Sequence, residues 1–164
     1  MLPTDYVNGQ SPPNGSVNPQ DLHPSDKQAL ADAVGEQMFA DDPATKHLGI
    51  QLVSIGPGRA NMQMVVQAFM ANGHGTCHGG YLFLFADSAF AFACNSHGQR
   101  AVAAGASIDF IAPAQVADTL TASAMMLNQS GRSGLYDINV HNQQGQLIAV
   151  FRGQSATIKG SFSI

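Results

Sequence analysis

A nearly uninterrupted apolar stretch over residues 80–95 limits the folds open to this chain more than any other feature. The stretch reads GYLFLFADSAFAFACN. It predicts a helix that is buried on most sides, because a surface helix would show a broad polar face. At 1.5 Å per residue, this helix would be about 24 Å long. Gly98 is its expected stop. A helix of this kind needs another layer of structure around it.

The rest of the chain supplies strands for that layer. Ala60, Met62, Met64 and Val66 recur at every second position before the helix, as in a half-buried strand. After the helix, turn-forming residues separate four expected strands at 100–112, 118–129, 133–142 and 147–158. One long apolar helix followed by antiparallel strands predicts an α+β domain in which an antiparallel sheet wraps the helix.

The N-terminal residues have a different composition. Residues 1–24 are rich in Pro, Gly and Asn and are expected to form a flexible leader, followed by one domain at 25–164. Ser25 or Asp26 is the expected cap of a helix over 27–40, which ends before Pro43. Its apolar residues fall at three- and four-residue spacings: Leu30, Ala33, Val34 and Met38.

Charge and cysteine content exclude several classes of function. Only 11% of the residues are charged, against roughly 25% in average soluble proteins, which favours an oligomer. The net charge is −4 and the seven Lys and Arg residues form no cluster in sequence, so no nucleic-acid partner is expected. The apolar run from Tyr81 to Ala86 is too short to cross a membrane. Free Cys77 and Cys94, without a secretory signal, favour the cytoplasm.

Common enzyme signatures are also missing. The sequence has no phosphate-binding loop, no nucleophile elbow of a serine hydrolase and no dinucleotide fingerprint. His74, Cys77 and His78 lie close together, but their spacing matches no standard zinc pattern. Neither a metal nor another cofactor is therefore expected.

Asp87 is the most unusual residue of the apolar helix. A carboxylate in such a helix must be partnered, protonated or functional. One interpretation is a structural Asp that bonds a neighbouring strand, and the other is a catalytic base or nucleophile. Ser88 is either its hydrogen-bonding partner or is bonded to its own backbone.

The segment before the helix supplies further candidates. Gly79 and Gly80 at its start either make a tight turn or offer backbone N–H groups to a developing oxyanion. His78 is expected to fix the loop, and Asn72 either builds a turn or holds a carbonyl or water. Cys77 is a weaker alternative nucleophile.

These residues closely resemble a known family. The pattern NGH-x-x-CHGG-x-LF-x-x-AD-x-AFA-x-ACNS at 72–96 is similar to the phenylacetate-degradation (PaaI-type) branch of the hotdog thioesterases. The resemblance extends over roughly residues 36–160 and includes SIDFIAP at 107–113, GLYDINVHNQQ at 134–144 and FRGQS at 151–155. It implies a hotdog fold and the hydrolysis of aryl-acetyl-CoA thioesters.

The resemblance also implies roles for individual residues. Asp87 is implied as base or nucleophile and the Gly79 N–H as oxyanion donor, with Asn72 and His78 lining the site. Ser88 stands where the family often has Thr. The resemblance also implies a dimer with its active sites at the dimer interface, and in this family such dimers commonly pair into tetramers.

The spacing of these groups bears on assembly. Gly79 and Asp87 are eight residues apart, or about 12 Å along one helix, too far to act on one carbon atom. Two antiparallel helices related by a two-fold axis would bring Asp87 of one subunit beside Gly79 of the other. Arg132, next to a loop glycine, is either a CoA-phosphate contact or an ordinary surface residue.

Other functions occur on related folds. A hydratase would normally pair its Asp with a nearby His, and residues 88–93 contain none. A non-catalytic acyl-CoA-sensing module often carries a DNA-binding segment, and the helix expected at 27–40 is too short and acidic for that role. Hydrolysis is therefore the leading hypothesis.

Overall fold

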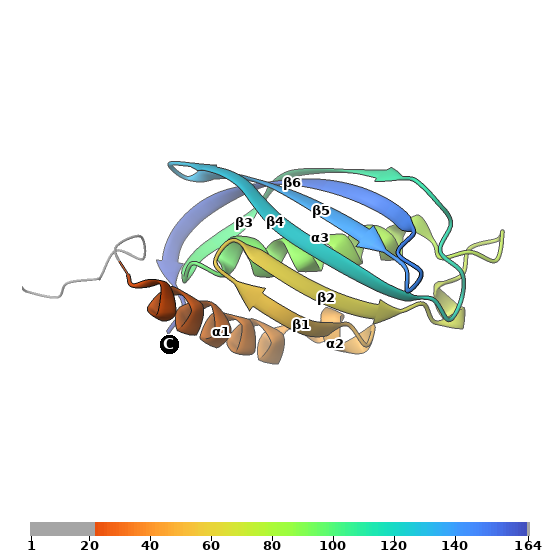
Figure 1. The fold of residues 1–164 in the computed structure, drawn as a ribbon, viewed down its shortest axis with the longest axis horizontal. Coiled ribbons are helices and arrows are strands. Elements are labelled where there is room, and N and C mark those ends of the chain that lie inside the picture. Colours follow the sequence, from red (N-terminus) through yellow and green to blue (C-terminus); the bar gives the residue numbers. More distant parts are fainter. Residues whose placement is uncertain (1–21, 164) are drawn as a thin grey trace, which may run out of the picture.

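The computed structural model describes residues 22–163, which form a six-stranded sheet and a long central helix (Figure 1). The strand order is β1-β2-β4-β5-β6-β3, and all neighbouring strands are antiparallel. Residues 1–21 of the predicted leader lie outside the described residues. The elements are α1 (Pro24–Asp41), α2 (Pro43–His47), β1 (Gln51–Gly56), β2 (Arg59–Val65), the 3-10 helix η2 (Ala68–Met70), α3 (Gly79–Asn95), β3 (Gln99–Phe110), β4 (Thr119–Ser130), β5 (Ser133–His141) and β6 (Leu147–Ser161).

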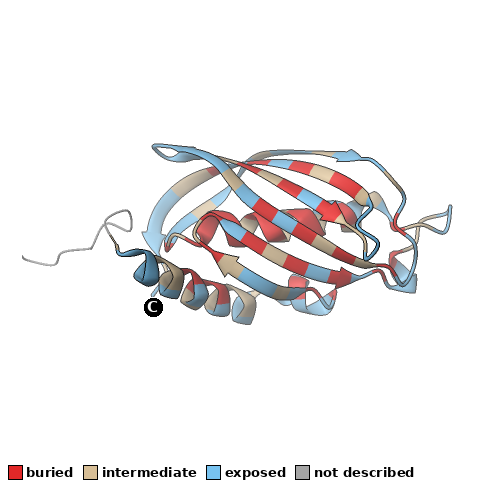
Figure 2. Ribbon diagram, in the orientation of Figure 1, coloured by how far each residue is buried: buried red, intermediate tan, exposed pale blue. Residues whose placement is uncertain are grey.

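Helix α3 fills the concave side of the sheet, which confirms the predicted α+β architecture. It begins one residue before the predicted start. The strands bury alternate residues against it, which Figure 2 shows as alternating colours along β2, β4 and β5. Met62, Tyr136 and Ile138 are at most 1% exposed. In the described part of the chain, no helix is long and apolar enough to span a membrane.

The first helix differs from the prediction at its start. It begins at Pro24, and its N-cap is His23, whose Nδ1 accepts a hydrogen bond from the Ser25 N–H at 3.4 Å. The predicted caps, Ser25 and Asp26, therefore lie inside the helix. Proline fits the first helical position because its fixed φ suits a helix and its missing N–H is not needed there.

A second short helix, α2, was not predicted. Asp42 caps it and accepts a hydrogen bond from the Thr45 N–H at 3.0 Å. Pro43 ends α1, as predicted, and also occupies the first turn of α2. The 3-10 helix η2 was missed as well, because three residues carry no readable period.

Gly153 on β6 is required by the ring that lies on it. A Cβ there would be 2.8 Å from Phe90, which is 1% exposed and packs edge-on against Tyr136 at 5.4 Å between ring centroids. We expect Gly153→Ala to lower the free energy of unfolding by about 1–3 kcal/mol, the usual cost of overpacking a core. Denaturant unfolding measures this change.

Gly105 on β3 is the matched control. A Cβ at Gly105 would meet only the flexible end of Gln154, at 3.7 Å. Gly105→Ala should therefore leave the free energy of unfolding within about 0.5 kcal/mol of the parent value. Equal losses in both variants would contradict the packing explanation.

Candidate active site

One face of α3 is left uncovered by the other residues that the structure describes, 22–163. Gly80, Leu84, Asp87 and Ala91 follow one another at spacings of three or four residues, and Phe83 lies beside Leu84. All five residues are exposed or half-buried. The other faces of α3 carry the buried residues of the core. A long helix with one open face suggests a groove for a ligand or a second subunit.

Asp87 lies in the middle of this open face. It is half-buried, and burial raises the pKa of its carboxyl above the ordinary value of 3.8. Within residues 22–163 its carboxylate accepts no hydrogen bond. The structural interpretation, in which Asp87 bonds a neighbouring strand, is therefore not what the structure shows. An unbonded carboxylate with a raised pKa is suited to act as a base or nucleophile.

The start of α3 leaves one backbone donor available. His78 caps the helix: its Nδ1 accepts from the Gly80 N–H at 2.9 Å, and its carbonyl accepts from Tyr81 at 2.9 Å and Leu82 at 3.4 Å. In the described chain, the Gly79 N–H donates to no group. His78 therefore fixes the loop, as predicted, and of the two glycines only Gly79 has a free N–H for an oxyanion.

The Phe110 ring at the end of β3 lies close to the backbone of Gly79. A Cβ at Gly79 would be 2.8 Å from the Phe110 ring. The ring is nevertheless 55% exposed, so it covers the helix start without being buried in the core. The sequence reasoning did not select this residue, although it lies in the SIDFIAP segment.

The loop before α3 is organised by Asn72. Its Oδ1 accepts from the His74 N–H at 2.8 Å and from the Thr76 N–H at 3.3 Å, and its Nδ2 donates to Thr76 Oγ1 at 3.2 Å. The turn-building interpretation of Asn72 thus describes its contacts in this chain. A contact of Asn72 with a substrate remains a prediction.

Cys77 is poorly suited to act as a nucleophile. Its side chain is 5% exposed, and burial raises its pKa to about 11. Almost none of it is thiolate at neutral pH, and the thiolate is the reactive form. The structure therefore argues against the Cys77 alternative.

Ser88 faces the short helix α2 and not Asp87. Its Oγ lies 3.4 Å from Thr45 Oγ1, which in turn donates to a carboxylate oxygen of Asp42. Thr45 is completely buried. This hydroxyl chain anchors α2 against α3 and defines one wall beside the open face. Thr45 was missed because α2 itself was not predicted.

The predicted site residues form a group with one exception. Asn72, His78, Gly79 and Gly80 surround the start of α3, and Asp87 and Ser88 lie two turns further along it. Arg132 lies in the β4–β5 turn, where its Nε donates to the Thr157 carbonyl at 2.9 Å. That turn is near the other end of α3. Among residues 22–163, no three His, Cys, Asp or Glu side chains are arranged to hold a metal ion.

Comparison with known proteins identifies the family. The thioesterase superfamily model matches residues 74–149. The chain is 48% identical to acyl-coenzyme A thioesterase PaaI of Escherichia coli over 126 residues, which cover 77% of this chain and 90% of that protein. It is 30% identical to human acyl-coenzyme A thioesterase 13 over 103 residues, 61% of this chain and 74% of that protein.

Solved structures agree with these sequence matches. The E. coli PaaI protein from the phenylacetic acid degradation operon superimposes with a TM-score of 0.81 at 46% identity, covering 82% of this chain and 97% of that one. The TT0310 protein of Thermus thermophilus gives a TM-score of 0.69 at 37% identity, covering 71% and 98%. The chain therefore belongs to the thioesterase superfamily and, within it, to the PaaI-type acyl-CoA thioesterases with a hotdog fold.

Proposed function

We propose that this acyl-CoA thioesterase hydrolyses aryl-acetyl-CoA, either phenylacetyl-CoA or hydroxylated derivatives, to the free acid and CoA. Two observations within residues 22–163 carry the proposal: the Asp87 carboxylate on the open face of α3 accepts no hydrogen bond, and the Gly79 N–H at the start of the same helix donates none. Acyl transfer to water needs one group that activates the nucleophile and one that stabilises the oxyanion.

The reaction can be written with Asp87 as base or as nucleophile. As a base, Asp87 takes a proton from water while the water oxygen attacks the thioester carbon. The carbonyl oxygen becomes an oxyanion that accepts a hydrogen bond from the Gly79 N–H. The C–S bond then breaks, the proton passes to the CoA sulfur, and the acid leaves. As a nucleophile, Asp87 would attack the thioester carbon and expel the CoA thiolate, which leaves a mixed anhydride on Asp87. Water would then hydrolyse the anhydride to the free acid and the Asp87 carboxylate, and the proton released would pass to the CoA sulfur.

Two subunits are needed to build one such site. Gly79 and Asp87 are separated by about 12 Å along α3, so the partner's Gly79 would face Asp87 across antiparallel helices. Strand β3 supports this arrangement because it is an edge strand of the sheet, and a second copy can pair with it. The open face of α3 would then be covered in the dimer.

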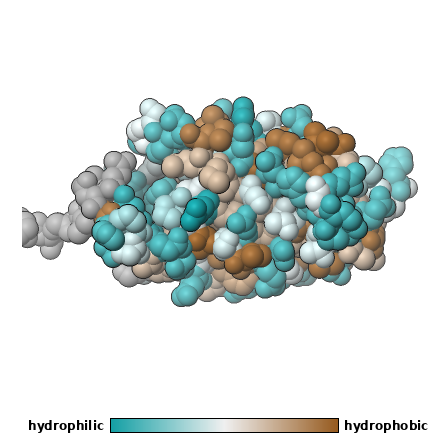
Figure 3. Space-filling model, viewed as in Figure 1, coloured by the Kyte–Doolittle hydropathy of each residue, from teal (hydrophilic) through white to brown (hydrophobic). Residues whose placement is uncertain are grey.

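The outer face of the sheet carries apolar residues that would suit a contact between two dimers. Val65, Met125 and Leu127 are exposed by 42%, 55% and 50%, and Figure 3 shows separate apolar patches on the side of the molecule facing the viewer. Exposed apolar residues of this kind are common at subunit contacts. They support the tetramer that we propose, with the outer sheet faces in contact.

Aromatic residues near the start of α3 favour an aryl substrate. Phe69 and Tyr81 pack edge to face with ring centroids 6.0 Å apart, and Phe110 lies on Gly79. Phe83 is 37% exposed on the open face. Rings so close to the proposed oxyanion donor would pack well against a substrate ring.

A substrate panel tests the proposal. We expect kcat/KM for phenylacetyl-CoA and hydroxyphenylacetyl-CoA to exceed that for acetyl-CoA and decanoyl-CoA at least about tenfold, since one well-buried group contributes roughly 1–3 kcal/mol of discrimination. Release of the CoA thiol is the measured signal. Equal values across the panel would reject the aryl preference, and no hydrolysis of any member would reject the thioesterase activity.

The alternatives have less support. Over residues 88–93, no His accompanies Asp87 as a hydratase would need, and the relatives compared above are named as thioesterases. A sensing module would not need an unbonded carboxylate beside the ligand. We infer a cytoplasmic enzyme, in keeping with the free, buried Cys77 and Cys94.

A further inference from the structure

A cavity of about 370 Å³ lies at the end of the molecule where α3 finishes. The start of α1, the β1–β2 turn, the start of β3 and the β4–β5 turn all reach this end (Figure 1). Side chains from these segments line the cavity, together with the last turn of α3 and the second half of β6. We call it the α3-end cavity. Its volume is that of about twelve water molecules, which is in the range of small-molecule binding sites.

The α3-end cavity is separate from the candidate active site. Cys94, which lines it, follows Asp87 by seven residues, or about 11 Å along α3. Between them, Phe90 fills the space between α3 and the sheet. It is 1% exposed, and its ring centroid lies 5.4 Å from that of Tyr136 and 6.0 Å from that of Phe151. A ligand in this cavity would therefore not touch the reacting thioester.

His97 brings an unpaired ring nitrogen to this cavity. Its Nε2 is buried and, within residues 22–163, has no hydrogen-bond partner. The same atom would be 3.4 Å from a Cβ at Gly58. Burial, together with the nearby charge of Lys27, lowers the pKa of His97, so the ring is neutral at neutral pH. A buried polar atom without a partner costs free energy, and a ligand that bonds this nitrogen would remove that cost.

The charges around the α3-end cavity favour an anion. Among the residues that line it, Lys27 is a cation and none is Asp or Glu. Two more cations adjoin it in sequence: Arg132 follows the lining residue Gly131, and Arg59 begins β2 two residues after Pro57. A recess surrounded by charges of one sign attracts ligands of the opposite sign, although the protein as a whole has a net charge of −4.

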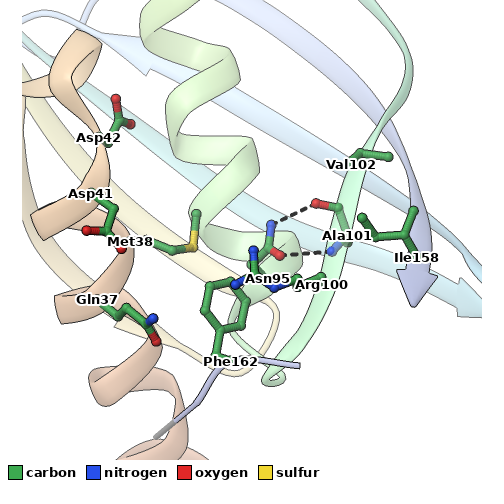
Figure 4. A pocket seen from close by; sticks show the side chains of 10 residues that line it. All are labelled: Gln37, Met38, Asp41, Asp42, Asn95, Arg100, Ala101, Val102, Ile158 and Phe162. Carbon is green, nitrogen blue, oxygen red and sulfur yellow. Dashed lines mark hydrogen bonds between the residues drawn. The ribbon is translucent and has the colours of Figure 1, made fainter. Parts of the chain in front are cut away.

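Another cavity provides a contrast. It has a volume of about 280 Å³ and lies between α1 and β3 (Figure 4). Arg100 lines it, but so do the carboxylates of Asp41 and Asp42. The Arg100 guanidinium carbon also lies 5.0 Å from the centre of the Phe162 ring. Charges of both signs do not favour an anion there, so the α3-end cavity is the better candidate for an anion site.

We propose that the α3-end cavity binds a small aromatic carboxylate. Lys27 and the Nε2–H tautomer of His97 would donate hydrogen bonds to the carboxylate. Met126 and Pro57 would pack against the ring, since a methionine sulfur makes favourable contacts with aromatic rings. The free acid released from an aryl-acetyl-CoA belongs to this class of ligand. The site goes beyond the thioesterase function, because binding here requires no hydrolysis.

Calorimetry with phenylacetate as the probe tests the proposal. The protein is first saturated with a non-hydrolysable thioether analogue of phenylacetyl-CoA, which occupies the active site. Phenylacetate should still bind. Phenylacetamide has the same shape without the charge and should bind at least about tenfold more weakly, the effect expected when a charge-assisted hydrogen bond becomes a neutral one. Loss of phenylacetate binding in the presence of the analogue would overturn the proposal, and so would equally tight binding of phenylacetamide.

Three variants locate the binding site. Lys27→Gln and His97→Phe should each weaken phenylacetate binding about tenfold. His97→Phe removes the unpaired buried nitrogen, so its free energy of unfolding should be no lower than that of the parent, and thermal unfolding checks this. Lys46→Gln is the matched control, because it removes an exposed cation of α2 that does not line the cavity. Parent-like binding in both Lys27→Gln and His97→Phe would overturn the proposal, as would an equal loss in Lys46→Gln.

Discussion

Asp87→Asn is expected to lower kcat for an aryl-acetyl-CoA at least about a hundredfold while the protein still folds and binds substrate. Removing a general base typically costs two to four orders of magnitude. The Asn side chain keeps the shape of the carboxylate but cannot take a proton. Steady-state kinetics and circular dichroism together measure this effect. Near-parental turnover in a folded variant would reject Asp87 as the catalytic carboxylate.

The pH dependence of kcat/KM in the parent protein and in Asp87→Asn provides a second test of the role of Asp87. Burial raises the pKa of Asp87 above 3.8, so kcat/KM of the parent should fall as pH drops through that raised value and Asp87 becomes protonated. The residual activity of Asp87→Asn should lack this acidic limb. A raised pKa also means that ionised Asp87 destabilises the fold. Asp87→Asn should therefore be at least as stable as the parent at neutral pH, with the difference disappearing at low pH.

Gly79→Pro is expected to lower kcat about a hundredfold or more below that of Gly79→Ala. Both variants place a Cβ against Phe110, but only proline removes the N–H that would bind the oxyanion. Losing one such donor typically costs 10²–10³ in kcat. Both variants share the steric change at Phe110, so the difference between their kcat values measures the effect of losing the N–H. Equal rates in the two variants would show that this N–H has no role in the reaction.

The local backbone makes this comparison feasible. Gly79 is the first residue of α3, a position that accepts proline. His78 already has φ −65° and ψ 133°, which is the conformation favoured before proline. The helix should therefore form in both variants, and thermal unfolding checks this. The double variant G79A/F110A should recover part of the loss of Gly79→Ala, since it removes the ring that the new Cβ meets.

Much of the fold could be predicted because its signals are local and periodic. The apolar residues 80–95 predicted α3, and the alternation from Ala60 to Val66 predicted a strand with one buried face. Boundaries were less accurate where one residue can play two parts. Pro24 looked like the end of the leader, but it is the first residue of α1. Asp42 ends one helix and caps the next, so α2 was missed.

The candidate site was predictable where sequence neighbours are also spatial neighbours. His78, Gly79 and Asp87 belong to one helix and the turn before it, so their spacing carried the information. Thr45 and Phe110 reach the same region from distant parts of the chain, and neither has a local signal. The position of Arg132, away from the other candidate residues, depends on the order of the strands, which a single sequence does not reveal.

The central claim is that each active site combines Asp87 of one subunit with Gly79 of its partner. Mixing Asp87→Asn subunits with Gly79→Pro subunits tests it most directly, because each mixed dimer then contains one site with both groups intact and one site with neither. We predict that purified mixed dimers recover about half of the parental kcat per dimer, while each variant alone stays at least about a hundredfold below the parent. Mixed dimers that are no more active than the separate variants would contradict the shared site and place both groups within a single subunit.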